Sequence, residues 1–190
     1  MARVFRRFVE GRYGQMHLRL TEPAPARRTP LVCLHMSPKS GRCFAKLMGA
    51  MGEDRVMVAP DYPGYGESDL PPETPPVRIE DYAACVWEAV DALGLGEVDL
   101  LGYHTGSKVA VEMAGQRGGS VRKILLISAS VFTPDELEQI KAYFEPIPLD
   151  EDGTRFKTMW SRVVEYRGPG MTLEMMANKR RPPRRRRLSQ

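Results

Sequence analysis

The chain has 190 residues, of which 42% are hydrophobic, so it can bury a real core and one large domain is the default expectation. Its three cysteines, Cys33, Cys43 and Cys85, are an odd number without a CxxC pair, and we expect small buried thiols in a reducing compartment. No N-terminal apolar signal segment and no run of about 18 apolar residues occurs. We therefore expect a cytoplasmic location and no membrane partner.

The formal net charge of +4 is concentrated at one end of the chain. Residues 179–190 hold seven of the 28 basic side chains and no acidic one, which leaves 21 basic against 24 acidic side chains, a net of −3, in residues 1–178. This tail is either an arm that binds nucleic acid through phosphate charge or a segment with no evolved role, such as a frameshift product. Its lack of aromatic residues favours the second interpretation, so nucleic acid is not an expected partner.

In chain order, the first predicted elements are two antiparallel strands, 4–10 and 15–20. A proline-rich connector, 21–30, is expected to lie outside the sheet. Short continuous apolar runs then predict strands buried on both faces. These runs are 31–36, 55–62, 98–103 and 121–130.

Helices are predicted between these strands, at 43–51, 79–93 and 106–116. Strict alternation of strand and helix predicts right-handed crossovers and an α/β three-layer sandwich with a mostly parallel sheet. Further helices are predicted from the capping box of Thr133 and Glu136, at 154–167, and after Gly170. The predicted domains are a core (1–130), a partial helical cap or lid laid over the sheet (131–178) and a disordered basic tail (179–190).

The turn "GYHTG" (102–106) carries the chemistry, because it joins a predicted strand to a predicted helix. This is the setting of the G-x-S-x-G nucleophile elbow, in which a strained central residue projects beside free amides at a helix start. His104 is that central residue. Ser107 is expected to cap or pack, His17 to lie on the surface, and Asp61 and Ser68 to hold a turn by local hydrogen bonds.

Residues 1–130 resemble the α/β-hydrolase fold family on four features in the family's order. They are "LHMSP" (34–38), "DYPGYGESD" (61–69), "LGYHTGS" (101–107) and "VRKILLISA" (121–129). The resemblance implies that His104 occupies the nucleophile position and that the backbone N–H groups of Ser37 and Thr105 form an oxyanion hole. It further implies that three residues line the pocket: His35, which in the family organises its loop, Met36 and Tyr103.

The chain departs from the family's pattern in three ways. Met36 replaces a glycine, and His104 replaces the usual serine, cysteine or aspartate. The family's triad ends in an acid and a histidine, but no histidine follows His104 and no strand-like run follows 121–130. Asp135 and Glu136 are expected to be helix caps rather than triad acids. We therefore expect a truncated member that lacks the last two strands.

These features favour a hydrolase-family protein related to small organic ester or acyl substrates, weakly active or inactive as it stands, so that its status as an enzyme stays open. A non-catalytic ligand-binding pseudoenzyme and a nucleic-acid-associated protein are the alternatives. No cofactor and no metal are expected, because the three histidines are dispersed. The expected partners are a small-molecule substrate or ligand and a second copy of the chain, through the edge strand 123–128.

Overall fold

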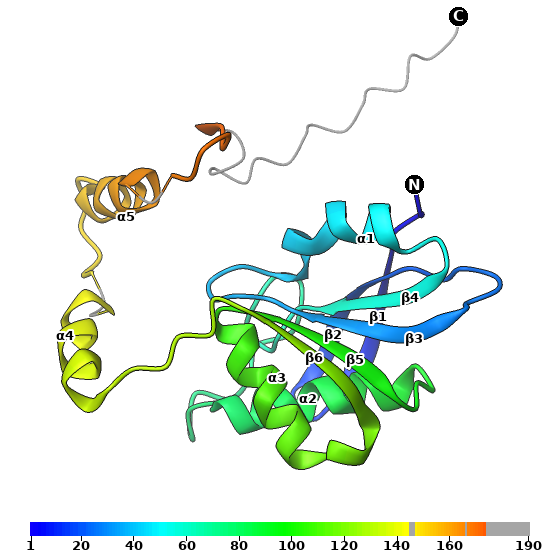
Figure 1. Ribbon diagram of the computed structural model, residues 1–190. Coiled ribbons are helices and arrows are strands. Elements are labelled where there is room, and N and C mark those ends of the chain that lie inside the picture. The colour runs from blue at the N-terminus through cyan, green and yellow to red at the C-terminus, as the bar shows by residue number, and fades with distance from the viewer. Residues whose placement is uncertain (145–146, 166, 174–190) are drawn as a thin grey trace, which may run out of the picture. The chain divides into compact units, whose positions relative to one another are not determined.

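The computed structural model describes residues 1–144, 147–165 and 167–173 (Figure 1). The chain divides into two compact units, Met1–Val131 and Phe132–Gln190. The basic tail predicted at 179–190 lies outside the described residues. None of the helices in the described part of the chain is long and apolar enough to cross a membrane.

The first unit is built on one six-stranded sheet in the order β1-β2-β4-β3-β5-β6. β1 pairs antiparallel with β2, and β2 with β4, whereas β4, β3, β5 and β6 run parallel. The strand bounds are β1 Phe5–Gly11, β2 Gly14–Leu20, β3 Arg28–Leu34, β4 Arg55–Pro60, β5 Val98–Tyr103 and β6 Val121–Ile127. The predicted mostly parallel sheet is confirmed, and no strand follows β6 in the described residues.

Helices cover both faces of this sheet (Figure 1). On one face a 3-10 turn, η1, leads into α1; α2 and α3 lie on the other face, and a second 3-10 turn, η2, precedes β6. Their bounds are η1 Gly41–Phe44, α1 Ala45–Met51, α2 Ile79–Ala92, α3 Thr105–Gln116 and η2 Gly118–Ser120.

The core follows from the pleat of β3, in which successive side chains point to opposite faces. Val32 and Leu34 pack with the buried side chains of α2 and α3. Leu31 and Cys33 pack with Phe44 and the buried side chain of α1. A strand covered on both sides needs a continuous apolar run, which is the pattern in the sequence. The predicted three-layer sandwich is confirmed.

The second unit contains α4 (Pro134–Phe144) and α5 (Thr154–Glu165). α4 begins with the predicted capping box: the Thr133 N–H donates to the Glu136 carboxylate at 2.8 Å, and the Glu136 N–H donates to Thr133 Oγ1 at 3.3 Å. The hydrogen bonds that the N–H and the hydroxyl of Thr133 donate to the Glu136 carboxylate lower the pKa of Glu136. The helix predicted after Gly170 falls almost entirely outside the described residues, and the role of this unit as a cap stays a prediction.

The prediction that 21–30 lies outside the sheet is wrong at its end, because β3 already begins at Arg28. The pairing of β3 with β4 is irregular between Arg28 and Leu31. Pro30 falls in this irregular stretch, where a residue without a backbone N–H is tolerated. β3 therefore begins earlier in the chain than the proline spacing indicated.

Two predictions of burial also need correction. Cys43 is exposed on the 3-10 turn, although Cys33 and Cys85 are buried as expected; burial raises the pKa of Cys33 to about 12. His17 was expected on the surface but is 0% exposed. The reason is its strand's place in the sheet, since β2 lies between β1 and β4 and its neighbours Met16 and Leu18 are buried as well.

Candidate functional site

A tight bend at His104 joins β5 to α3. This residue has φ 52° and ψ −115°, a conformation that a side chain with a Cβ rarely adopts. Its N–H donates to the Ile127 carbonyl at 2.9 Å, and its own carbonyl accepts the Ser107 N–H at 2.8 Å. The bend is thus held by the neighbouring strand on one side and by the first turn of the helix on the other.

Two glycines make this bend possible. A Cβ on Gly106 would lie 1.9 Å from the Leu34 carbonyl oxygen, and one on Gly102 would lie 2.5 Å from the Gly106 carbonyl oxygen. Both are far below van der Waals contact, so only glycine lets α3 approach β3 and β5 this closely. The result is an exposed His104 side chain at the carboxyl end of the sheet, with its ring 5.3 Å from the Tyr103 ring.

The loop after β3 carries the second histidine of this edge. His35 is 0% exposed; its Nδ1 lies 2.9 Å from the Met36 carbonyl oxygen, and its Nε2 accepts the Tyr62 N–H at 3.2 Å. Burial lowers the pKa of His35. The ring is therefore neutral at pH 7 with its hydrogen on Nδ1, and neither nitrogen is left for a ligand.

Ser37 connects this loop to the helix start. Its backbone N–H donates to the Thr105 hydroxyl at 3.3 Å, and its Oγ donates to the Tyr65 hydroxyl at 3.1 Å. Ser37 and Thr105, the predicted oxyanion donors, are thus brought together. The sequence did not indicate that the Thr105 side chain would accept the N–H of Ser37.

Asp61 holds the loop after β4 in place by hydrogen bonds. Its carboxylate accepts the Gly41 N–H at 2.7 Å and the Glu67 N–H at 3.0 Å, and lies 2.9 Å from Nδ1 of His17. Ser68 Oγ donates to the Asp61 carbonyl at 2.7 Å. Asp61 and Ser68 therefore hold a turn as predicted, and Asp61 also joins loops that are distant in the sequence.

Tyr65 is a member of this constellation that sequence reasoning missed. It stands between Gly64 and Gly66, which have φ values of 82° and 62°, so the chain turns sharply on both sides of it. A Cβ on Gly66 would lie 2.0 Å from the Asp61 carboxylate. The available signal was an aromatic residue between two glycines, at the tip of a loop that follows a buried strand.

A family model described as alpha/beta hydrolase fold matches residues 29–146. This chain belongs to the alpha/beta hydrolase fold family. The match covers β4, β5, β6 and all of β3 except Arg28, and so every loop of the site described above.

Curated relatives of this hydrolase-family chain include a proline iminopeptidase of Heyndrickxia coagulans, 28% identical over 74% of the chain and 52% of the relative. A 3-hydroxybutyrate-oligomer hydrolase of Cupriavidus necator is 30% identical over 70% of the chain and 44% of the relative. The chain thus spans about half the length of the curated relatives it matches. The solved N-acyl homoserine lactonase AidH, complexed with N-butanoyl homoserine, has the same fold, with a TM-score of 0.71, 22% identity and coverage of 91% of this chain and 63% of that one.

The side chains of the bend differ in their hydrogen bonding. Ser107 is buried, and its Oγ donates to the Gly102 carbonyl at 2.9 Å and contacts the Ile127 carbonyl at 3.1 Å, which agrees with the predicted packing role. The His104 imidazole has no hydrogen-bond partner among the described residues. Tyr103 lies beside it, half-buried, at the end of β5.

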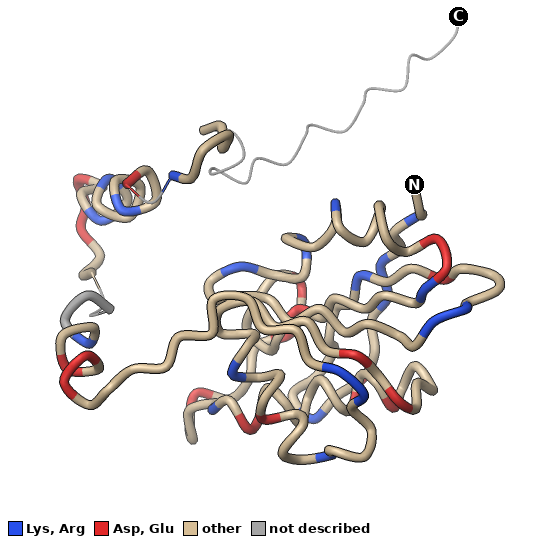
Figure 2. The backbone as a smooth tube through the Cα atoms, in the orientation of Figure 1, with Lys and Arg blue, Asp and Glu red and all other residues tan. Residues whose placement is uncertain are grey.

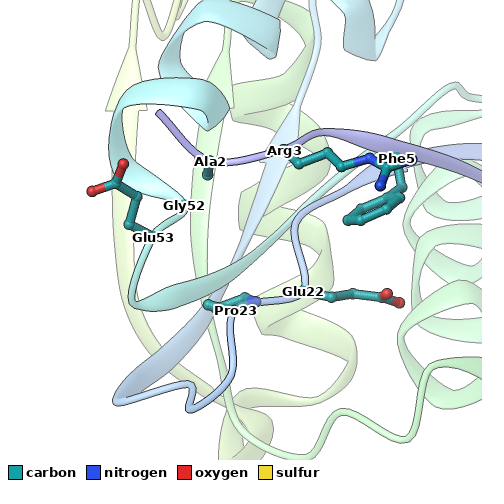
Figure 3. Close-up of a pocket in the computed structure, with 7 residues that line it drawn as sticks. All are labelled: Ala2, Arg3, Phe5, Glu22, Pro23, Gly52 and Glu53. Atoms are coloured by element: carbon teal, nitrogen blue, oxygen red, sulfur yellow. The ribbon is translucent and has the colours of Figure 1, made fainter.

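A shallow hollow of about 270 Å³ lies elsewhere in the hydrolase fold (Figure 3). It adjoins the segment just before β4, at the amino end of the parallel strands, whereas His104 stands at their carboxyl end. Its acidic residues have partners: Glu22 pairs with Arg7 at 2.6 Å, and Glu53 with the N-terminal amine at 2.6 Å. The lining residues are Ala2, Arg3, Phe5, Glu22, Pro23, Gly52 and Glu53.

The charged side chains of the described residues do not indicate a second functional site. Basic and acidic residues are interspersed along the first unit (Figure 2), and within the described ranges no group of three or more His, Cys, Asp or Glu residues could hold a metal ion. At the amino end of the strands, Asp99 is bound by Arg122 and Arg55. Burial acts to raise the pKa of Asp99, but the hydrogen bonds and charge of these two guanidinium groups hold it below its usual value.

Proposed function

We propose that this hydrolase-family protein binds a small organic ester or other acyl compound at the carboxyl ends of β3 and β5, and that its 190 residues turn such a compound over only weakly. The observation that carries this proposal is the exposed His104 imidazole at a bend with φ 52° and ψ −115°. Related hydrolases whose names denote a peptidase, an oligomer hydrolase and a lactonase support an acyl substrate.

The chemistry open to this arrangement is attack by a neutral imidazole. A ring nitrogen of His104 forms a bond to the acyl carbon, the bond to the leaving alkoxide or phenolate breaks, and the N–H proton of the acylated ring passes to the leaving oxygen or to solvent. Water then cleaves the acyl-imidazole, releases the carboxylic acid and restores the ring. The Thr105 N–H, which belongs to the first turn of α3, and the Ser37 N–H are the donors proposed for the developing oxyanion. Met36 and Tyr103 are proposed to line the pocket, whereas His35, which was expected to line it as well, is 0% exposed and holds its loop instead.

Weak turnover is expected for two reasons. Among the described residues no carboxylate orients the His104 ring, and such an orienting group contributes strongly in enzymes that use an Asp–His pair. In addition, the Ser37 N–H must leave the Thr105 hydroxyl before it can bind an oxyanion.

Hydrolysis of p-nitrophenyl acetate tests the proposal. The full chain should exceed free imidazole at the same concentration only modestly, because the acid–base partners that contribute about 10²–10⁴-fold in enzymes are absent from the described residues. His104→Ala should fall to the buffer rate, whereas His104→Gln controls for the polarity of the position. Equal rates for the full chain and His104→Ala would overturn the role of His104, and a rate thousands of times above free imidazole would overturn weak turnover.

Binding separates the proposal from its alternative. A non-catalytic binder would be stabilised against heat by N-hexanoyl homoserine lactone and would show no His104-dependent hydrolysis of any ester. If neither hydrolysis nor stabilisation by this lactone occurs, the proposed acyl site is wrong.

We also propose that the chain self-associates through 123–128. In the described residues β6 pairs only with β5, so its outer edge carries free backbone groups. Four consecutive apolar side chains of β6, Ile124–Ile127, are at least 40% exposed. Sedimentation velocity should find a dimer or larger species for the full chain and a shift towards monomer for Leu125→Lys; a monomer in both would contradict the proposal.

A further inference from the structure

Two residues at the carboxyl edge of the sheet share an uncommon backbone conformation. His104 has a φ of 52° and Ser128 a φ of 54°, and among the described residues these are the only ones besides glycines with a positive φ. A residue with a Cβ adopts this region rarely and at a cost in free energy. Strained residues of this kind gather at binding and catalytic sites, so Ser128 is a candidate for a function of its own.

The two strained residues are neighbours. Tyr103 and Ile127, the last residues of the parallel strands β5 and β6, lie opposite each other, and His104 and Ser128 follow them directly. The His104 N–H donates to the Ile127 carbonyl oxygen at 2.9 Å. Because the nitrogen of Ser128 is bonded to that carbonyl carbon, standard bond lengths place it within about 5 Å of the His104 nitrogen.

The Ser128 hydroxyl is available for a ligand. Ser128 is exposed, as His104 is, and within the described ranges neither side chain has a hydrogen-bond partner. The hydroxyl groups of Ser37 and Ser107 at the same edge are, by contrast, hydrogen-bonded within the chain. A small molecule held at His104 is therefore within reach of a second free polar group.

The strand order decides which part of an acyl compound meets this hydroxyl. β5 lies between β3 and β6 in the sheet. Ser37, one of the proposed oxyanion donors, follows β3, whereas Ser128 follows β6. If the carbonyl oxygen of a compound bonded to His104 is directed towards Ser37, the other substituents of the acyl carbon spread away from it, towards β6.

One of these substituents is the leaving oxygen. When its bond to the acyl carbon breaks, the electron pair stays on this oxygen, which becomes negatively charged. A hydroxyl group that donates to it stabilises the developing charge. The gain is largest for a basic leaving group, because a weakly basic oxygen such as that of p-nitrophenolate delocalises its charge.

We propose that Ser128 is a further catalytic residue, whose hydroxyl donates a hydrogen bond to the leaving oxygen of the acyl compound. The inference rests on the function proposed above. It extends that function to a substrate class, namely esters and lactones with a strongly basic leaving oxygen.

Comparison of two esters tests this inference. For Ser128→Ala, the His104-dependent hydrolysis of phenyl acetate should be about fivefold slower than for the full chain, the change expected for one neutral hydrogen bond. Hydrolysis of p-nitrophenyl acetate should change by less than about twofold. Ser120→Ala, which removes a hydroxyl group next to the amino end of β6, is the matched control and should leave both rates unchanged.

A second variant separates the hydroxyl group from the backbone strain. Ser128→Gly removes the hydroxyl and adopts φ 54° without a Cβ clash, so its melting temperature should exceed that of Ser128→Ala by about 3 °C. Its rates with the two esters should equal those of Ser128→Ala. Thermal melting also verifies that each variant is folded, and the glycine variant decides alone if the alanine variant does not fold.

The outcomes distinguish the two proposals. If removal of the hydroxyl slows both esters equally, or slows neither, while hydrolysis still depends on His104, the role of Ser128 is wrong and the acyl site stands. If neither ester is hydrolysed in a His104-dependent manner, the proposed turnover fails and this inference fails with it.

Discussion

The loop after β3 and the turn after β5 each place a histidine at the carboxyl edge of the same sheet, and the two histidines differ in burial and in hydrogen bonding. The strands are in register, with Leu34 opposite Gly102. His35 is fully buried with both ring nitrogens hydrogen-bonded, whereas His104 is exposed and its ring has no hydrogen-bond partner among the described residues. The same side chain is a structural part of one loop and the reactive candidate of the other.

The difference arises from what packs over each residue. The His35 ring is covered by Tyr62, whose ring centre lies 4.0 Å away and whose N–H donates to Nε2. His104 sits on a strained bend that turns its side chain away from the packed layers. Burial and backbone geometry, rather than residue type, thus separate a loop-holding histidine from an available one.

The largest expected effect on stability comes from a substitution at the contact between α3 and β3, which joins the segments that carry the two histidines. Gly106→Ala would place a Cβ 1.9 Å from the Leu34 carbonyl oxygen and should lower the free energy of unfolding by about 3 kcal/mol. Gly115→Ala in the same helix has no atom within 4 Å and should instead stabilise by about 0.5 kcal/mol. Urea unfolding of both variants measures this, and similar values for the two would contradict the close approach of α3 to β3.

Replacing each of the two histidines with alanine should change the free energy of unfolding by different amounts. His35→Ala leaves a cavity and a buried Tyr62 N–H without its acceptor, at a cost of about 2–3 kcal/mol. His104→Ala should change the free energy of unfolding by less than about 0.5 kcal/mol, as for other exposed positions. Equal losses in urea unfolding would mean that the two side chains are not in different environments.

The strained backbone at His104 predicts that a glycine at this position would stabilise the protein. His104→Gly should raise the free energy of unfolding by about 1 kcal/mol, because glycine adopts φ 52° and ψ −115° without a Cβ clash. His104→Ala, which keeps the Cβ, is the control. A glycine variant less stable than the alanine variant would show that the bend stores no strain.

The smallest effect expected is a pH dependence due to His35. Burial lowers its pKa below the ordinary 6.5, so the unfolded chain takes up a proton first as the pH falls. The stability due to this group is complete above pH 6.5 and is lost as the pH falls from there through the lowered pKa of the folded state. Melting temperatures of the full chain and of His35→Gln between pH 7.5 and 5 test this; a fall of the same size in both would assign the effect to other groups.

Much of this molecule follows from short-range pattern. The apolar runs at 98–103 and 121–130 predicted strands β5 and β6, and the capping box of Thr133 and Glu136 marked the start of α4. The strand-to-helix turn at His104 was also predictable, since its flanking glycines are visible in the sequence. Such features depend on residues a few positions apart, whose geometry the backbone fixes locally.

Partners distant along the chain could not be found in this way. The burial of His17 depends on β2 lying between β1 and β4, and its Asp61 partner is 44 residues away. Tyr65 joins the site only because Ser37, 28 residues away in the sequence, approaches its hydroxyl. A single sequence states which groups can donate and accept, but not which of them meet. Periodicity and turn chemistry therefore gave the fold and the place of the bend, whereas packing of the loops against one another assigned each polar side chain its partner, because burial and hydrogen bonding arise from contacts between segments.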